Sequence, residues 1–141
     1  MADPLVEQLG RILPADGALW VLGSTRGLLP PGRRPPLRLD SLSPPGSRHE
    51  PPTAILVADL GGRDALAVAR ALGPHLRAGG LLVFAVPTGR SGLLGFRRPP
   101  TELEDLCEAL LAVGMTGIGG WAGTGRRALA WGASSVRRRG D

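Results

Sequence analysis

The chain has 141 residues, a length that predicts one domain, or two at most. Apolar residues make up 43% of the chain and charged residues 21%, so we expect a buried core rather than disorder. No apolar stretch approaches the roughly 20 residues that a membrane-spanning helix needs. One cysteine excludes an internal disulfide framework and a cysteine-based zinc site, and two histidines leave little for a histidine-rich one, so we expect no bound metal.

All 17 positively charged residues are arginine, and the net charge is +5. A GC-rich genome explains this bias through its preference for Arg, Ala, Gly and Pro codons. The alternative is selection for phosphate or carboxylate recognition, because a guanidinium group binds both with two parallel hydrogen bonds. The N-terminus carries Asp3 and Glu7 and lacks a basic segment ahead of an apolar run, so we expect no secretory signal and a cytoplasmic protein.

Three short apolar runs have the pattern of strands that are buried on both faces of a parallel sheet. They cover residues 18–22, 53–58 and 81–86. Residues 37–40 have the length of a short edge strand. Residues 115–121 and 127–131, with a Gly-Thr-Gly turn between them, predict an antiparallel hairpin at one edge of the sheet.

Three segments show the helical spacing of apolar residues. The first opens at Asp3, an acidic cap with proline at the first helical position after it. The second covers residues 64–72, and the third covers residues 101–113, where Thr101 and Glu104 form a capping box. The apolar stripe predicted for the third helix, in which the cysteine packs as a core residue, consists of Leu103, Leu106, Cys107, Leu110 and Leu111.

Buried strands that alternate with helices predict an α/β fold with a mostly parallel sheet, helices on both of its faces and a C-terminal antiparallel hairpin. We expect a single domain over residues 1–133, in which residues 24–52 form Pro-rich loops around the short edge strand. Residues 134–141 are then an exposed basic tail. His75 is expected to lie at the surface, in the turn that follows the second helix.

Two stretches resemble a known family. The segment ALGPHLRAGGLLVF at residues 71–84 is similar to the part of class I S-adenosylmethionine-dependent methyltransferases in which a helix leads through a Gly-Gly turn into the fifth strand. Residues 103–131 resemble the last helix and closing hairpin of that family. The resemblance, good over residues 53–133 and poor over residues 1–52, implies a Rossmann-like sheet in a reduced methyltransferase-like core.

The resemblance also implies a cofactor site at the carboxyl ends of the first strands, with Gly23, Ser24, Asp40 and Asp59 as its residues. Asp40 stands where the family keeps an acid for the ribose hydroxyls, and the alternative is a turn aspartate. Asp59 stands where the family keeps residues that face the substrate, and the alternative is an N-cap or turn aspartate. The family's Gly-x-Gly loop is eroded, because no acidic residue precedes Gly23 and the middle glycine is missing.

The segment between the second and third strands, residues 41–52, is too short for a βαβ crossover. We therefore expect the sheet to be one strand short and one of its faces to lack its usual helical cover. An uncovered apolar face has to be hidden by the Pro-rich loops, by the N-terminal helix or by another chain. This predicts a homodimer or a subunit of a larger protein complex.

Three functions are compatible with these features. The first is a methyltransferase-like domain that has lost catalysis, has no catalytic residues and no cofactor, and acts as a scaffold or partner subunit. The second is a minimal active methyltransferase that binds S-adenosylmethionine at the four residues named above. The third is an arginine-rich nucleic-acid-binding module in which Arg90, Arg97 and Arg98 hold phosphates.

Overall fold

The computed structural model of the protein describes residues 4–14, 17–23, 29, 36–39, 42, 51–87, 103–121 and 127–134. Its elements, in chain order, are α1 (Pro4–Ile12), β1 (Leu19–Leu22), β2 (Leu37–Leu39), β3 (Ala54–Val57), α2 (Ala65–Leu72), the 3-10 turn η1 (Gly73–His75), β4 (Leu81–Pro87), α3 (Leu103–Ala112), β5 (Thr116–Trp121) and β6 (Arg127–Ala133). This order confirms the predicted succession of helices and strands. None of the helices described is long and apolar enough to cross a membrane.

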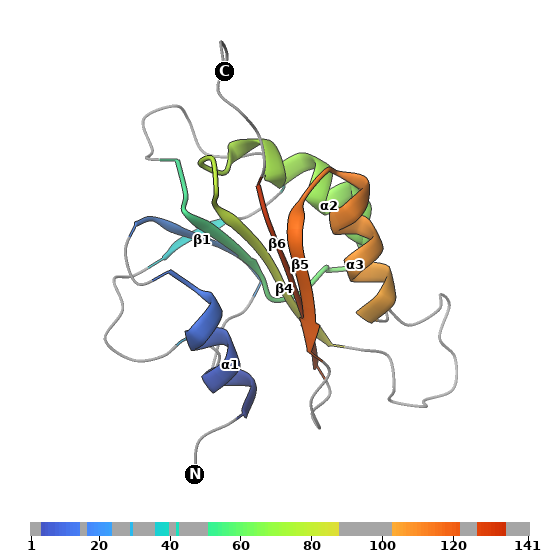
Figure 1. The fold of residues 1–141 in the computed structure, drawn as a ribbon, viewed down its shortest axis with the longest axis horizontal. Helices are drawn as coiled ribbons and strands as arrows, with labels where there is room; N and C mark the ends of the chain where they lie inside the picture. The colour runs from blue at the N-terminus through green and yellow to red at the C-terminus, as the bar shows by residue number, and fades with distance from the viewer. Residues whose placement is uncertain are drawn as a thin grey trace.

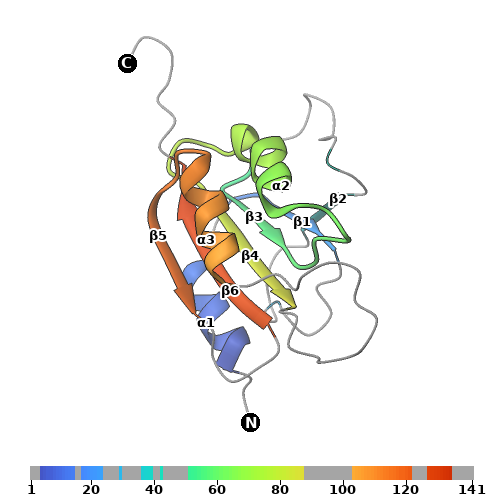
Figure 2. The ribbon, with the colours of Figure 1, turned by 90° about the vertical axis from the view of Figure 1, so that its right-hand side faces the viewer.

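The six strands form one sheet in the order β2-β1-β3-β4-β6-β5. The first four strands are parallel, and β6 runs antiparallel to both β4 and β5. Figure 2 shows β2 at one edge of the sheet and the β5–β6 hairpin at the other. The structure thus confirms a mostly parallel α/β sheet that ends in an antiparallel hairpin, with a short strand at the opposite edge.

Helices cover both faces of the sheet, and they do so unequally (Figure 1). On one face, α2 and α3 enclose a core built on alternate strand residues such as Ile55 and Phe84. On the other face, α1 packs Leu9 and its neighbours against Leu56 and Val83. Because both faces of β3 and β4 are buried, their sequences contain no polar residue. Among the described residues, α1 is the only helix in contact with the second face, as expected for a face that has lost part of its cover.

The buried face of α3 differs from the predicted stripe, which included Leu111 and omitted Ala109. Leu106 and Leu110 are fully buried, but Leu111 is 65% exposed. Each helical residue turns about 100° further around the axis, so Leu111 leaves the buried face that Leu110 occupies. Ala109 lies on that face instead and is buried. Leu111 was therefore wrongly assigned to the core.

The packing of α3 can be tested by removing its buried leucine side chains. We expect Leu106→Ala and Leu110→Ala each to lower the free energy of unfolding by about 2–5 kcal/mol, the range for buried leucines that leave a cavity. Leu111→Ala is the matched control and, at low protein concentration, should change it by less than about 0.5 kcal/mol, because that side chain is exposed in the single chain. Chemical denaturation measures all three. Equal effects at the three positions would contradict the observed orientation of α3.

Candidate functional site at the carboxyl edge of the sheet

The strand order creates one place where a ligand crevice is expected. From β1 the chain continues to β2 on one side and then returns to β3 on the other side. In open α/β sheets, ligands bind beyond the carboxyl ends of the strands at such a reversal. Gly23 directly follows β1, and Asp59 lies just beyond β3. The structure therefore brings two of the four residues predicted for the cofactor site to this reversal.

Gly23 and Asp59 are in close contact. The backbone of Gly23 has a φ of +97°, and a Cβ atom at this position would lie 2.8 Å from the nitrogen of Asp59 and 2.9 Å from its Cβ. The nitrogen of Ala58 donates a hydrogen bond of 2.8 Å to the oxygen of Leu22, which joins the same two chain segments. Gly23 is thus required both by its positive φ and by the approach of the neighbouring backbone.

Asp59 is exposed and organises the turn that follows it. Its Oδ1 accepts a hydrogen bond of 2.9 Å from the nitrogen of Gly61, an Asx turn of the kind predicted as one alternative. It is not the N-cap of α2, because Asp64 occupies that position and accepts from the nitrogen of Ala67 at 3.3 Å. The second oxygen, Oδ2, accepts no hydrogen bond from the described part of the chain, so a ligand hydroxyl can donate to it.

Arg127 is a residue of this edge that sequence reasoning missed. Because β6 is antiparallel to β4, its first residue lies at the carboxyl end of β4, opposite Pro87. The Nη1 atom of Arg127 donates to the oxygen of Ala58 at 2.8 Å and to the oxygen of Ala85 at 2.6 Å. The half-buried guanidinium group thus ties β3 to β4 with a permanent positive charge. The available signal was an arginine at the start of an otherwise apolar strand.

Five further predicted site residues lie outside the described residues. They are Ser24, Asp40, Arg90, Arg97 and Arg98. Their proposed contacts with a cofactor or with nucleic acid therefore stay predictions. Within the described part of the chain, no three His, Cys, Asp or Glu side chains form a group that could hold a metal ion.

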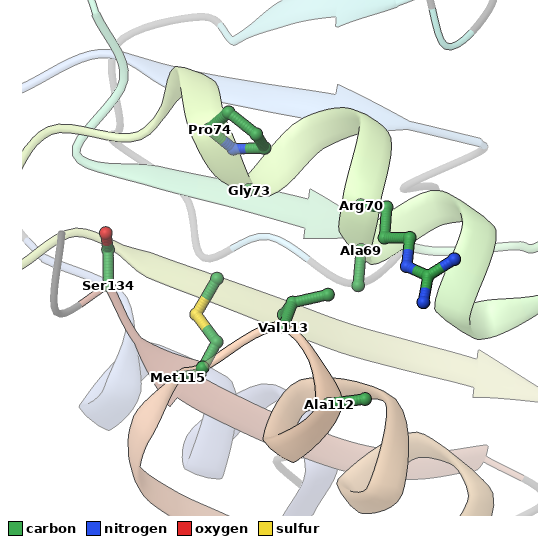
Figure 3. A pocket seen from close by; sticks show the side chains of 9 residues that line it. Ala69, Arg70, Gly73, Pro74, Ala112, Val113, Met115 and Ser134 are labelled. Carbon is green, nitrogen blue, oxygen red and sulfur yellow. The ribbon is translucent and has the colours of Figure 1, made fainter.

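A cavity of about 470 Å³ lies elsewhere, between the C-terminal ends of α2 and α3 (Figure 3). Its walls are apolar except for Arg70 and Ser134, and Val113 and Met115 extend toward the α2 side of it. Its volume suits a small ligand. However, Ser134 follows the end of β6, so the cavity is at the amino edge of the parallel strands, opposite Gly23 and Asp59. The carboxyl edge stays the candidate site because the chain reversal is there.

His75 and Cys107 carry side chains that can take part in chemistry, and both pack against other residues of the fold. His75 lies in the predicted turn after the second helix and is half-buried, and its ring centroid lies 6.0 Å from that of the buried Trp20. Cys107 is half-buried and packs against the core on the α3 side. Burial raises the pKa of the Cys107 thiol, which keeps it protonated and unreactive at neutral pH.

The close contact at Gly23 is tested by adding one methyl group. We expect Gly23→Ala to lower the free energy of unfolding by about 3 kcal/mol, because strain at positive φ adds to a clash with Asp59. Gly62→Ala is the matched control, since Gly62 has a φ of +83° and open space around it. It should cost only the backbone strain, about 1 kcal/mol. Equal losses for the two variants in denaturant unfolding would show that the Asp59 contact has no energetic weight.

The bridge made by Arg127 is tested by a side chain of similar length without donors. Arg127→Met should lower the free energy of unfolding by about 1–3 kcal/mol, because two buried carbonyl oxygens lose their partner. Arg38→Met, at an exposed arginine of β2, should stay within about 0.5 kcal/mol of the natural chain. Thermal unfolding of both variants makes the comparison. A neutral result at Arg127 would contradict the bridge.

Comparison with known proteins supports the fold that the geometry describes. No family model matches the chain, and no curated protein matches its sequence. Among solved structures, the apo form of the S-adenosylmethionine-dependent methyltransferase SibL matches 96% of this chain with a TM-score of 0.59 and 14% identity. The match covers 53% of SibL, so the chain spans about half the length of that protein.

Two further solved structures have similar lengths. Precorrin-6y C5,15-methyltransferase from Geobacter metallireducens matches 92% of this chain and 86% of its own, with a TM-score of 0.54 and 15% identity. An rRNA methylase from Streptococcus thermophilus matches 95% of this chain and 98% of its own, with a TM-score of 0.52 and 13% identity. Identities this low bear on the fold alone. The chain has a class I methyltransferase-like fold in a reduced form, as the resemblance implied.

Proposed function

We propose that this chain is a methyltransferase-like domain that does not transfer methyl groups and serves as a partner subunit in a protein assembly. The observation that carries the proposal is Arg127, whose guanidinium group occupies the carboxyl edge between β3 and β4.

The charge of Arg127 is the wrong sign for a cationic methyl donor. S-adenosylmethionine carries a positive sulfonium beside the methyl group that it transfers. Two like unit charges 4 Å apart repel each other by about 4 kcal/mol at an effective dielectric constant of 20. Arg127 also takes up the oxygens of Ala58 and Ala85, which would otherwise offer negative partial charge to a cation. A cofactor that placed its sulfonium beside Arg127 is therefore disfavoured at this edge.

The two residues that the resemblance links to a cofactor have a folding role here. Gly23 lacks a side chain because the backbone of Asp59 fills that space, so its glycine is explained without a ligand. Asp59 commits one carboxylate oxygen to the nitrogen of Gly61. Both features persist in a domain that no longer binds S-adenosylmethionine, because the fold itself needs them.

The thin cover on one face of the sheet supports the assembly role. Within the described residues, α1 is the helix on that face, and Trp121 and Trp131 are only half-buried there. Aromatic side chains with one accessible side are enriched at protein interfaces. A partner chain that covered them would replace the helical cover that this reduced fold lacks.

A minimal active methyltransferase is the second candidate function. It is favoured by the position of Gly23 and Asp59 at the chain reversal and by Oδ2 of Asp59, which is open to a ligand hydroxyl. In this alternative, Ser24 and Asp40 complete the binding site for S-adenosylmethionine. The two candidates differ in one measurable property, the affinity for that cofactor.

Calorimetric titration separates the candidates. We expect dissociation constants weaker than about 1 mM, that is, binding weaker than about −4 kcal/mol, for both S-adenosylmethionine and its demethylated product. The product is the control, because it has no sulfonium charge. Micromolar binding of either ligand that Asp40→Ala abolishes would overturn the proposal and favour the active alternative.

A further inference from the structure

The two edges of the sheet differ in their protection against pairing with another chain. The edge strand β2 has three residues, and its central Arg38 is exposed. The edge strand β5 has six residues, TGIGGW, and none is charged. Natural edge strands are commonly short, charged or covered, because their free backbone groups otherwise pair with other strands. β2 has two of these safeguards, whereas the described residues give β5 only a register irregularity between Thr116 and Gly119.

The outer strand β5 pairs with β6 and packs closely on both faces, so the position of its outer edge is well defined. Its register with β6 is regular from Gly119 to Trp121. A Cβ atom on Gly119 would overlap the ring of Trp131, which lies on the α1 face. A Cβ atom on Gly120 would lie 3.0 Å from Cδ1 of Leu103 on the opposite face. Gly119 and Gly120 therefore allow close packing on the two faces of β5, and neither adds a side chain at its outer edge.

Apolar side chains flank this edge. Cys107 is 3.4 Å from the Cβ position of Gly120, and Leu111 follows Cys107 by four residues, so both lie on the β5 side of α3. Leu111 is 65% exposed and is the one large exposed hydrophobic residue among those described. Ile118 lies half-buried on the same face, and Trp121 lies half-buried on the other. A strand added beside β5 would cover all three side chains together.

We propose that β5 is the surface through which two copies of this chain pair, with antiparallel β5 strands around a twofold axis that join their sheets into one. A twofold contact places each surface against itself, so it requires a self-complementary patch. The β5 strand meets this requirement because none of its six residues brings a charge to the axis. Elsewhere, a chain with a net charge of +5 tends to set arginine against arginine, as Arg38 would do at β2.

This pairing deepens the proposed assembly role, on which it rests, by naming a second copy as the partner. It predicts a particle of twice the 14.6 kDa of one chain in light scattering of the purified full-length protein, at concentrations from about 1 to about 100 µM. Amide hydrogen exchange should show the backbone of residues 119–121 protected in that particle and exchanging faster on dilution.

Two variants of neighbouring residues on α3 test whether the dimer contact lies at β5. Leu111→Glu places a charge against its own copy and should raise the dimer dissociation constant at least about tenfold. Ala112→Glu is the matched control, because it adds the same charge to an exposed residue that lines the cavity on the α2 side, and it should change the constant less than about threefold. Ile118→Lys should act like Leu111→Glu, with circular dichroism as the check on its folding.

A monomer at about 100 µM would overturn the pairing. So would a dimer that survives Leu111→Glu, or one that Ala112→Glu weakens equally. These outcomes are distinct from a failure of the proposed function, which would appear as S-adenosylmethionine binding in the titration, whatever the mass of the particle.

Discussion

The two hydrogen bonds from Arg127 to the oxygens of Ala58 and Ala85 set the chemistry of the carboxyl edge. A buried carbonyl oxygen at the end of a strand, where the pairing with the next strand stops, needs another hydrogen-bond donor. Without one, the free energy of unfolding falls by about 1–3 kcal/mol. Here a side chain from the C-terminal hairpin supplies that partner. The hairpin therefore does more than close the sheet, since it also fixes the charge that any ligand between β3 and β4 would meet.

Most of the fold could be predicted because its signals are local. Buried apolar runs of four to seven residues marked β1, β3 and β4, and helical spacing marked α1, α2 and α3. What the sequence pattern missed depends on neighbours distant in sequence. Leu111 lies at the margin of its stripe, and only the position of β5 and the sheet relative to α3 decides that it faces solvent. His75 packs on Trp20, a contact between segments more than fifty residues apart.

The candidate site was predictable in position and not in detail. Gly23 and Asp59 could be named because each follows a buried strand, and the family resemblance implied that these strands are neighbours. Their roles depend on a φ angle and on distances of about 3 Å between backbones, which no sequence pattern encodes. Arg127 was missed for a related reason, because its place at the carboxyl edge follows from the antiparallel register of β6 against β4.

The sheet order separates assembly from ligand chemistry. In the order β2-β1-β3-β4-β6-β5, the chain reversal lies between β1 and β3. The edge strand without a charged residue, β5, lies at one end of the sheet. Pairing at β5 would extend the sheet away from the reversal, so the surroundings of Gly23 and Asp59 would be the same in both copies. A reduced methyltransferase-like fold can therefore gain an interface at β5 without a change in the residues at the reversal between β1 and β3.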